Sequence, residues 1–118
     1  MLDHVKAEMI KRDNIERDWL IPFMNFVDNF RYNKHISLVT KPISINHNRF
    51  DAILTATTCY LCHEQNFKIP HWVNDVPYCK PAWFLIDIDR LKPFMSIESP
   101  IWFKVYNIFV SRNFLVRI

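Results

Sequence analysis

The chain contains no glycine among its 118 residues. The glycine-rich loops of dinucleotide-binding folds and of Walker-type sites need residues without a Cβ where the backbone meets phosphate, so both kinds of site are excluded. Tight two-residue hairpins also rely on glycine at positive φ, which favours helices joined by loops over long sheets. Ten asparagines are present, and asparagine can occupy the left-handed positions that glycine usually takes.

A long apolar run is also missing. No stretch of about 18 uncharged apolar residues occurs, and the first residues, MLDHVKAEMIKRDN, are charged throughout. We therefore expect neither a transmembrane helix nor a signal peptide, and hence a cytoplasmic protein. Because 50 % of the residues are hydrophobic and 23 % are charged, we expect one globular domain over residues 1–118 that buries its own core.

An aromatic stripe with helical spacing is the strongest periodic signal. Its members are Ile15, Trp19, Phe23, Phe26 and Phe30. The spacing predicts a helix that starts near Asp13, stops at Asn33 and buries the stripe in the core. Pro22 predicts either a kink or a break that places this proline in the first turn of a second helical piece.

A second helix is predicted over residues 48–65, capped by Asn46 or Asn48 and ended by a left-handed Asn66. Its predicted buried face consists of Phe50, Ile53, Leu54, Thr57, Tyr60 and Leu61. Residues 34–46 are predicted to be an extended connection with a short strand at 36–39. The three prolines and two tryptophans of residues 67–84 predict an ordered loop that covers the helices.

The C-terminal third is predicted to add two helices and an ordered end. Residues 85–98 are interpreted as a helix, and Ser99 followed by Pro100 is typical of a cap and first turn. Residues 107–118 hold seven apolar residues in twelve, so we expect them to pack on the core, with Ser111 starting a last turn. The predicted fold class is all-α: a small single-domain bundle of about four helices with long, ordered loops rich in proline and tryptophan.

The excess positive charge lies at the C-terminal end. Residues 1–98 carry 12 basic and 12 acidic side chains, so the net charge of +3 comes from Lys104, Arg112 and Arg117. Three cations fall short of the six to ten phosphate contacts of firm DNA binders. A solvated surface is the favoured interpretation, and contact with an acidic partner or with nucleic acid is the alternative.

The segment Cys59-Tyr60-Leu61-Cys62-His63 matches the C-x-x-C-H string that attaches c-type haem. Zinc is a second interpretation, with Cys79 and either His63 or His71 completing the ligands, and a redox dithiol is a third. The helical period through this segment favours ordinary buried thiols over all three. No cofactor or metal is therefore expected.

No catalytic motif is present in the sequence. The five histidines lie in unrelated surroundings, without an HExxH helix or a G-x-S-x-G turn. Asp87 and Asp89 alternate with isoleucines and could form a metal pair on one side of a strand, but a solvated face is the favoured interpretation. The sequence does not indicate an enzyme.

The motifs IPHWV, PAWF and a final ESP-I-x-F-x-V-x-NIFV-S-x-N-x-L-x-R run resemble a family of small bacterial proteins. The matching residues are Pro70, Trp72, Val73, Pro81, Trp83, Phe84, Glu98, Ser99, Pro100, Phe103, Asn107, Ile108, Phe109, Val110, Ser111, Asn113, Leu115 and Arg117. A looser match begins near Trp19, so the resemblance covers about residues 15–118. The resemblance implies the partner of a nucleotidyltransferase-type protein in a two-gene module, with an antitoxin or regulatory role.

The leading hypothesis is therefore a non-enzymatic domain that binds another protein, such as a nucleotidyltransferase-like toxin. Aromatic and arginine side chains are common interface anchors. The candidate partner-binding residues are Trp102, Lys104, Tyr106, Arg112 and Arg117. The alternative is a nucleic-acid-binding regulator whose basic, aromatic C-terminal segment contacts phosphates through Lys104, Arg112 and Arg117.

Overall fold

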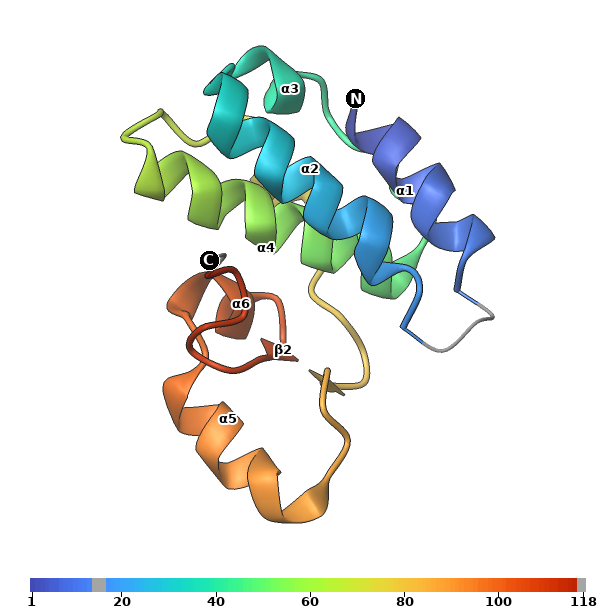
Figure 1. Cartoon of the computed structure of the whole chain (residues 1–118), viewed down its shortest axis with the longest axis vertical. Helices are drawn as coiled ribbons and strands as arrows, with labels where there is room; N and C mark the ends of the chain where they lie inside the picture. Colours follow the sequence, from blue (N-terminus) through green and yellow to red (C-terminus); the bar gives the residue numbers. More distant parts are fainter. Residues whose placement is uncertain (14–16, 117–118) are drawn as a thin grey trace.

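A central helix, α4 (Asn48–Glu64), organises the fold in a computed structural model that describes residues 1–13 and 17–116 (Figure 1). Every residue of α4 from Phe50 to Cys59 is buried. The helix packs against α1 (Leu2–Lys11) and α2 (Leu20–Asn33), and also against α6 (Ile101–Val105). Because neighbours cover it on several sides, α4 buries far more than the single face that its sequence period predicts.

The remaining elements are short. They are α3 (Ser37–Thr40), the 3-10 helices η1 (His71–Asp75) and η2 (Asp89–Leu91), α5 (Lys92–Glu98), and the strands β1 (Trp83–Phe84) and β2 (Ile108–Phe109). The two strands pair in parallel, with Trp83 opposite Ile108. Figure 1 shows α5 at the far end of the molecule from α3. Among the described residues four helices have seven or more residues, so the all-α fold class is confirmed.

Helix α2 confirms the aromatic stripe. Trp19, Phe23, Phe26 and Phe30 are all buried, whereas Ile15 lies outside the described residues. Pro22 is the third residue of α2 and lies in its first turn, as one of the two predicted arrangements has it, and there its missing N–H leaves no helical hydrogen bond unmade. The predicted start near Asp13 is wrong, because α2 begins at Leu20 and residues 17–19 form turns.

Helix α1 is not among the predicted helices. Its buried side chains are Leu2, Val5, Lys6 and Met9, which recur at the spacing of one helical face. Lys6 interrupts the apolar spacing of this face, and a helix prediction relies on that spacing.

Two predictions for residues 34–48 are wrong. The expected strand at 36–39 is replaced by α3, in which the Thr40 hydroxyl donates to the Ile36 carbonyl and the Trp72 indole N–H donates to the Val39 carbonyl at 2.9 Å. Neither Asn46 nor Asn48 caps α4. The cap is His47, whose Nδ1 accepts the Phe50 N–H at 3.2 Å.

The predicted helix over residues 85–98 is too long. Leu85 lies in a bend directly after β1, where its N–H donates to the Phe109 carbonyl. The α-helix begins only at Lys92, with Pro93 in its first turn. The short helix after Pro100 is confirmed as α6, but Ser99 does not cap it through its side chain.

The C-terminal segment packs on the core, as predicted. Ile108, Val110 and Leu115 are buried. Asn107 has a φ of 62°, and its side-chain amide donates to the Cys79 carbonyl at 2.9 Å. Asn66 is also left-handed, with a φ of 60°, so asparagine does take positions that glycine would otherwise fill.

Across the described residues, no helix is both long enough and apolar enough to cross a bilayer.

Candidate protein-interaction surface

Four large apolar side chains lie exposed on the consecutive helices α5 and α6. The exposed fraction is 64 % for Phe94, 78 % for Ile97, 62 % for Ile101 and 60 % for Val105. Phe94 and Ile97 are one helical turn apart on α5, and Ile101 and Val105 are one turn apart on α6, so each pair shares a helix face. We call these four residues the α5–α6 ridge. Each pair gives its helix an exposed apolar face, and exposed apolar faces are where protein partners commonly dock.

The ridge is held in place from beneath. Met95 anchors α5 in the protein interior, with 3 % of its surface exposed. The Lys104 ammonium of α6 donates to the Ile97 carbonyl at 2.9 Å and so ties the two helices together. The backbone that carries the ridge side chains is therefore held in place before a partner binds. This lowers the conformational entropy that is lost on docking.

The buried Ser99 hydroxyl joins the end of α5 to the segment after β2. It accepts the Val110 N–H at 2.8 Å and lies 2.5 Å from the Met95 carbonyl and 2.7 Å from the Val110 carbonyl, donating to one of these at a time. This contact gives Ser99 its role in the fold, in place of the helix cap that its position before Pro100 predicts.

Replacing Ser99 with alanine is expected to lower the free energy of unfolding by about 1–3 kcal/mol, because the buried Val110 N–H loses its acceptor. Urea denaturation followed by circular dichroism measures the change. The matched control is Ser96→Ala on the same helix, since the Ser96 hydroxyl is exposed and only bonds back to the Lys92 carbonyl; this change is expected to stay within about 0.5 kcal/mol. Equal losses in the two variants would contradict the bridging role.

Two of the predicted partner-binding residues are engaged with the core. Trp102 is half-buried, and its ring lies 5.4 Å from that of His63. Tyr106 is buried, and its hydroxyl donates to the Val73 carbonyl at 2.6 Å. Burial, with a smaller contribution from the nearby Cys59, raises the pKa of Tyr106 to about 12. Tyr106 therefore acts as a structural residue.

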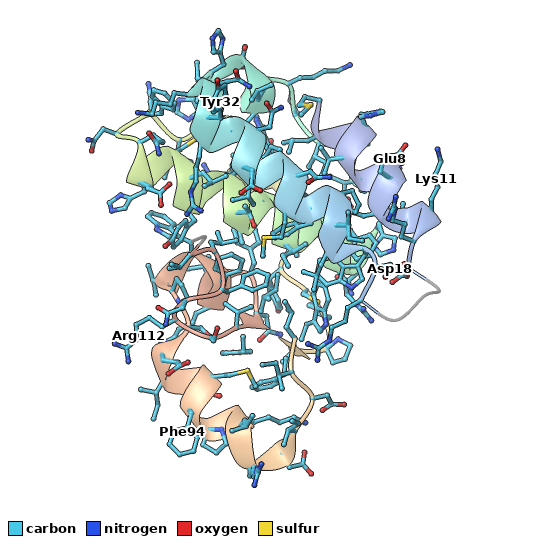
Figure 2. The ribbon with its side chains drawn as sticks, viewed as in Figure 1. Glu8, Lys11, Asp18, Tyr32, Phe94 and Arg112 are labelled. Carbon is cyan, nitrogen blue, oxygen red and sulfur yellow. The ribbon has the colours of Figure 1, made fainter. Side chains whose placement is uncertain are left out.

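Two of the three predicted basic residues, Lys104 and Arg112, are among the described residues and contact the C-terminal part of α5. Lys104 is partly buried in its contact with Ile97. Arg112 is exposed, its backbone N–H donates to a Glu98 carboxylate oxygen at 3.2 Å, and Figure 2 shows it at the same edge of the molecule as Phe94. Arg117 lies outside the described residues. The structure thus places the Lys104 ammonium beside α5, and the backbone of the exposed Arg112 beside the Glu98 carboxylate.

None of the four ridge residues is among the binding candidates that the sequence predicts. Phe94 and Met95 both lie in the helix predicted over residues 85–98, and the structure buries only Met95. A seven-residue helix such as α5, with apolar side chains on more than one side, cannot bury all of them against one neighbour. The number of apolar residues in α5 is therefore the signal that could have identified its exposed side chains.

The thiols lie in the core and are free. Cys59 and Cys62 are buried on α4, and burial raises the pKa of each to about 11. Burial also raises the pKa of Cys79. The thiolate is the form that attacks or ligates, so these protonated thiols are unreactive near neutral pH.

A metal centre at this string is not assembled by the fold. His63 is exposed and packs beside Trp102. Over residues 1–13 and 17–116, no three His, Cys, Asp or Glu side chains form a group that could hold a metal ion. Asp87 and Asp89 are highly exposed and both pair with Lys92, at 3.0 and 3.2 Å.

Comparison of the chain with protein-family models, with curated proteins and with solved structures finds no match.

Proposed function

We propose that this chain is a non-enzymatic protein-binding domain that docks its partner on the α5–α6 ridge. The observation that carries the proposal is the exposure of Phe94, Ile97, Ile101 and Val105 on two consecutive helices that the core supports. Burying a large apolar side chain contributes about 1.5–3 kcal/mol. A few such anchors at the centre of an interface supply most of its binding energy.

Two basic residues beside α5 indicate the chemistry of the partner. Lys104 bonds to the Ile97 carbonyl, and Arg112 is exposed next to Glu98, so we expect the complementary surface to combine an apolar patch with carboxylates. The family resemblance of the C-terminal run supports a specific candidate, a nucleotidyltransferase-like toxin made from a neighbouring gene, to which this chain would be the antitoxin or regulatory component.

The test is co-expression with the product of the neighbouring gene, followed by pull-down and a titration of the purified pair. The double variant Phe94→Ala/Ile97→Ala is expected to weaken binding about 100-fold or more, because each central anchor contributes roughly 2 kcal/mol. Rescue of growth from the partner's toxicity is expected to fall in parallel. The matched control is Tyr32→Ala, an aromatic side chain that is 88 % exposed at the opposite end of the molecule (Figure 2).

Two outcomes would overturn the proposal. One is the absence of any complex with the wild-type chain, and the other is a double variant that binds as tightly as the Tyr32 control. A parallel titration with duplex DNA and with RNA at low salt examines the nucleic-acid alternative, in which Arg112→Ala would weaken binding. We expect no such binding, because the three cations of the C-terminal segment fall short of the six to ten phosphate contacts of firm DNA binders.

A further inference from the structure

A hollow of about 380 Å³ lies where the start of α2, the start of α4 and β1 meet. Its lining includes two arginines, Arg17 and Arg49, and two tryptophans, Trp19 and Trp83. The rest of the lining is apolar and half-buried, and it consists of Leu20, Leu85, Ile86 and Phe114. None of the ridge residues lines it, so the hollow is a separate feature of the surface.

The two guanidinium groups bring positive charge to the hollow. Both arginines are exposed, and neither forms an ion pair with a carboxylate of the described residues. The Arg49 guanidinium lies over the Trp83 ring, 4.4 Å from its centroid. Stacking on an indole holds the guanidinium plane while its edge remains free to donate hydrogen bonds.

The aromatic side chains of the lining pack against other rings. The Trp19 ring is buried and lies 5.4 Å from the rings of both Phe50 and Trp83. Phe114 stacks on the buried Phe23, with the ring centroids 5.8 Å apart. Packed rings that still expose part of their surface form a preformed apolar site, and ligand sites combine such walls with a few polar groups that fix orientation.

We propose that this hollow binds a small organic anion with a flat, apolar body. The carboxylate or phosphate of the ligand lies between Arg17 and Arg49, whose planar donor groups match the geometry of both anions. The ring of the ligand packs against Leu85 and Phe114. A volume of about 380 Å³ accommodates one substituted ring with its anionic group.

The test is a titration of the full chain with phenyl phosphate and with benzoate, followed by tryptophan fluorescence and by the NMR signals of the indole N–H groups. At least one of these anions is expected to bind ten times more tightly than inorganic phosphate and than phenol, which carry the charge and the ring separately. The tighter of the two identifies the anionic group. Arg17→Ala and Arg49→Ala are each expected to weaken binding about tenfold or more, since each removes charge-assisted hydrogen bonds.

The matched control is Arg90→Ala, which removes an exposed arginine of η2 outside the hollow and is expected to leave the affinity unchanged. If Arg49→Ala fails to fold, Arg49→Lys replaces it as the test variant. It keeps the positive charge but loses the planar donor group, so an affinity between those of the wild type and the alanine variant is expected. The proposal is overturned if neither aryl anion binds more tightly than inorganic phosphate, or if the Arg17 and Arg49 variants bind like the Arg90 control.

Discussion

Replacement of Lys6 by methionine is expected to lower the free energy of unfolding by about 3–5 kcal/mol. The buried Lys6 ammonium donates to Oδ1 of Asp51 at 2.7 Å, to the Ser44 carbonyl at 2.6 Å and to Oδ1 of Asn46 at 2.5 Å. Oδ2 of Asp51 accepts the N–H groups of Asn46 and His47, each at 2.7 Å. Methionine would leave the Asp51 carboxylate, 2 % exposed, without a counter-charge.

The measurement is urea denaturation of the variant beside Lys11→Met, a matched change on the same helix. The Lys11 side chain is 71 % exposed in its pair with Glu8, so its loss is expected to cost under about 1 kcal/mol. The double variant Lys6→Met/Asp51→Asn is expected to lose less than the sum of the single variants, because no unpaired charge remains in the core. If Lys6→Met were as mild as Lys11→Met, the buried network would not be a main support of the fold.

The same network explains why the sequence does not predict α1. A lysine inside an apolar stripe is normally solvated, and only the carboxylate of Asp51, 45 positions along the chain, makes its burial favourable. The aromatic stripe of α2 needs no such distant partner, so its period alone predicts the buried residues. The local sequence pattern therefore predicts the buried residues of a helix when all of them are apolar.

The short elements depend on tertiary contacts in a similar way. The β-branched residues of the segment around Val39 favour a strand, but the Trp72 indole N–H binds the Val39 carbonyl in a helical turn. Ser99 has the sequence position of a helix cap, yet its hydroxyl instead accepts the buried Val110 N–H. In both cases the decisive group is distant in the sequence.

The α5–α6 ridge and the hollow could not be predicted from the sequence, for different reasons. Phe94 and Met95 are adjacent and equally apolar, and only the packing of α5 decides which of them stays exposed. In the hollow, Arg17, Arg49 and Trp83 come from three separate segments. No local pattern could group them, whereas the excess of basic residues near the C-terminus was readable from composition alone.

Ending the chain after Val105 is expected to abolish folding, and it is the largest effect that the structure predicts. The removed segment contains three fully packed aliphatic side chains, Ile108, Val110 and Leu115, whose burial alone contributes about 5–9 kcal/mol. A domain of this size is stabilised by about 5–15 kcal/mol in total. The cut also removes the carbonyl oxygens of Tyr106 and Phe109 that accept the Cys79 and Leu85 N–H groups.

The truncation also removes a hydrogen bond between Arg31 and the Leu115 carbonyl. The Arg31 guanidinium donates to the Glu64 carboxylate at 2.8 and 2.9 Å, which holds the pKa of Glu64 below its usual range, and it also donates to the Leu115 carbonyl. Circular dichroism and solubility of the truncated chain measure the result, with Ile108→Ala as a graded companion expected to cost about 2–5 kcal/mol. The control is Val116→Ala, since Val116 is 55 % exposed, and little change is expected. A truncated chain that melts like the intact protein would instead show that the segment is a docking tail for the partner.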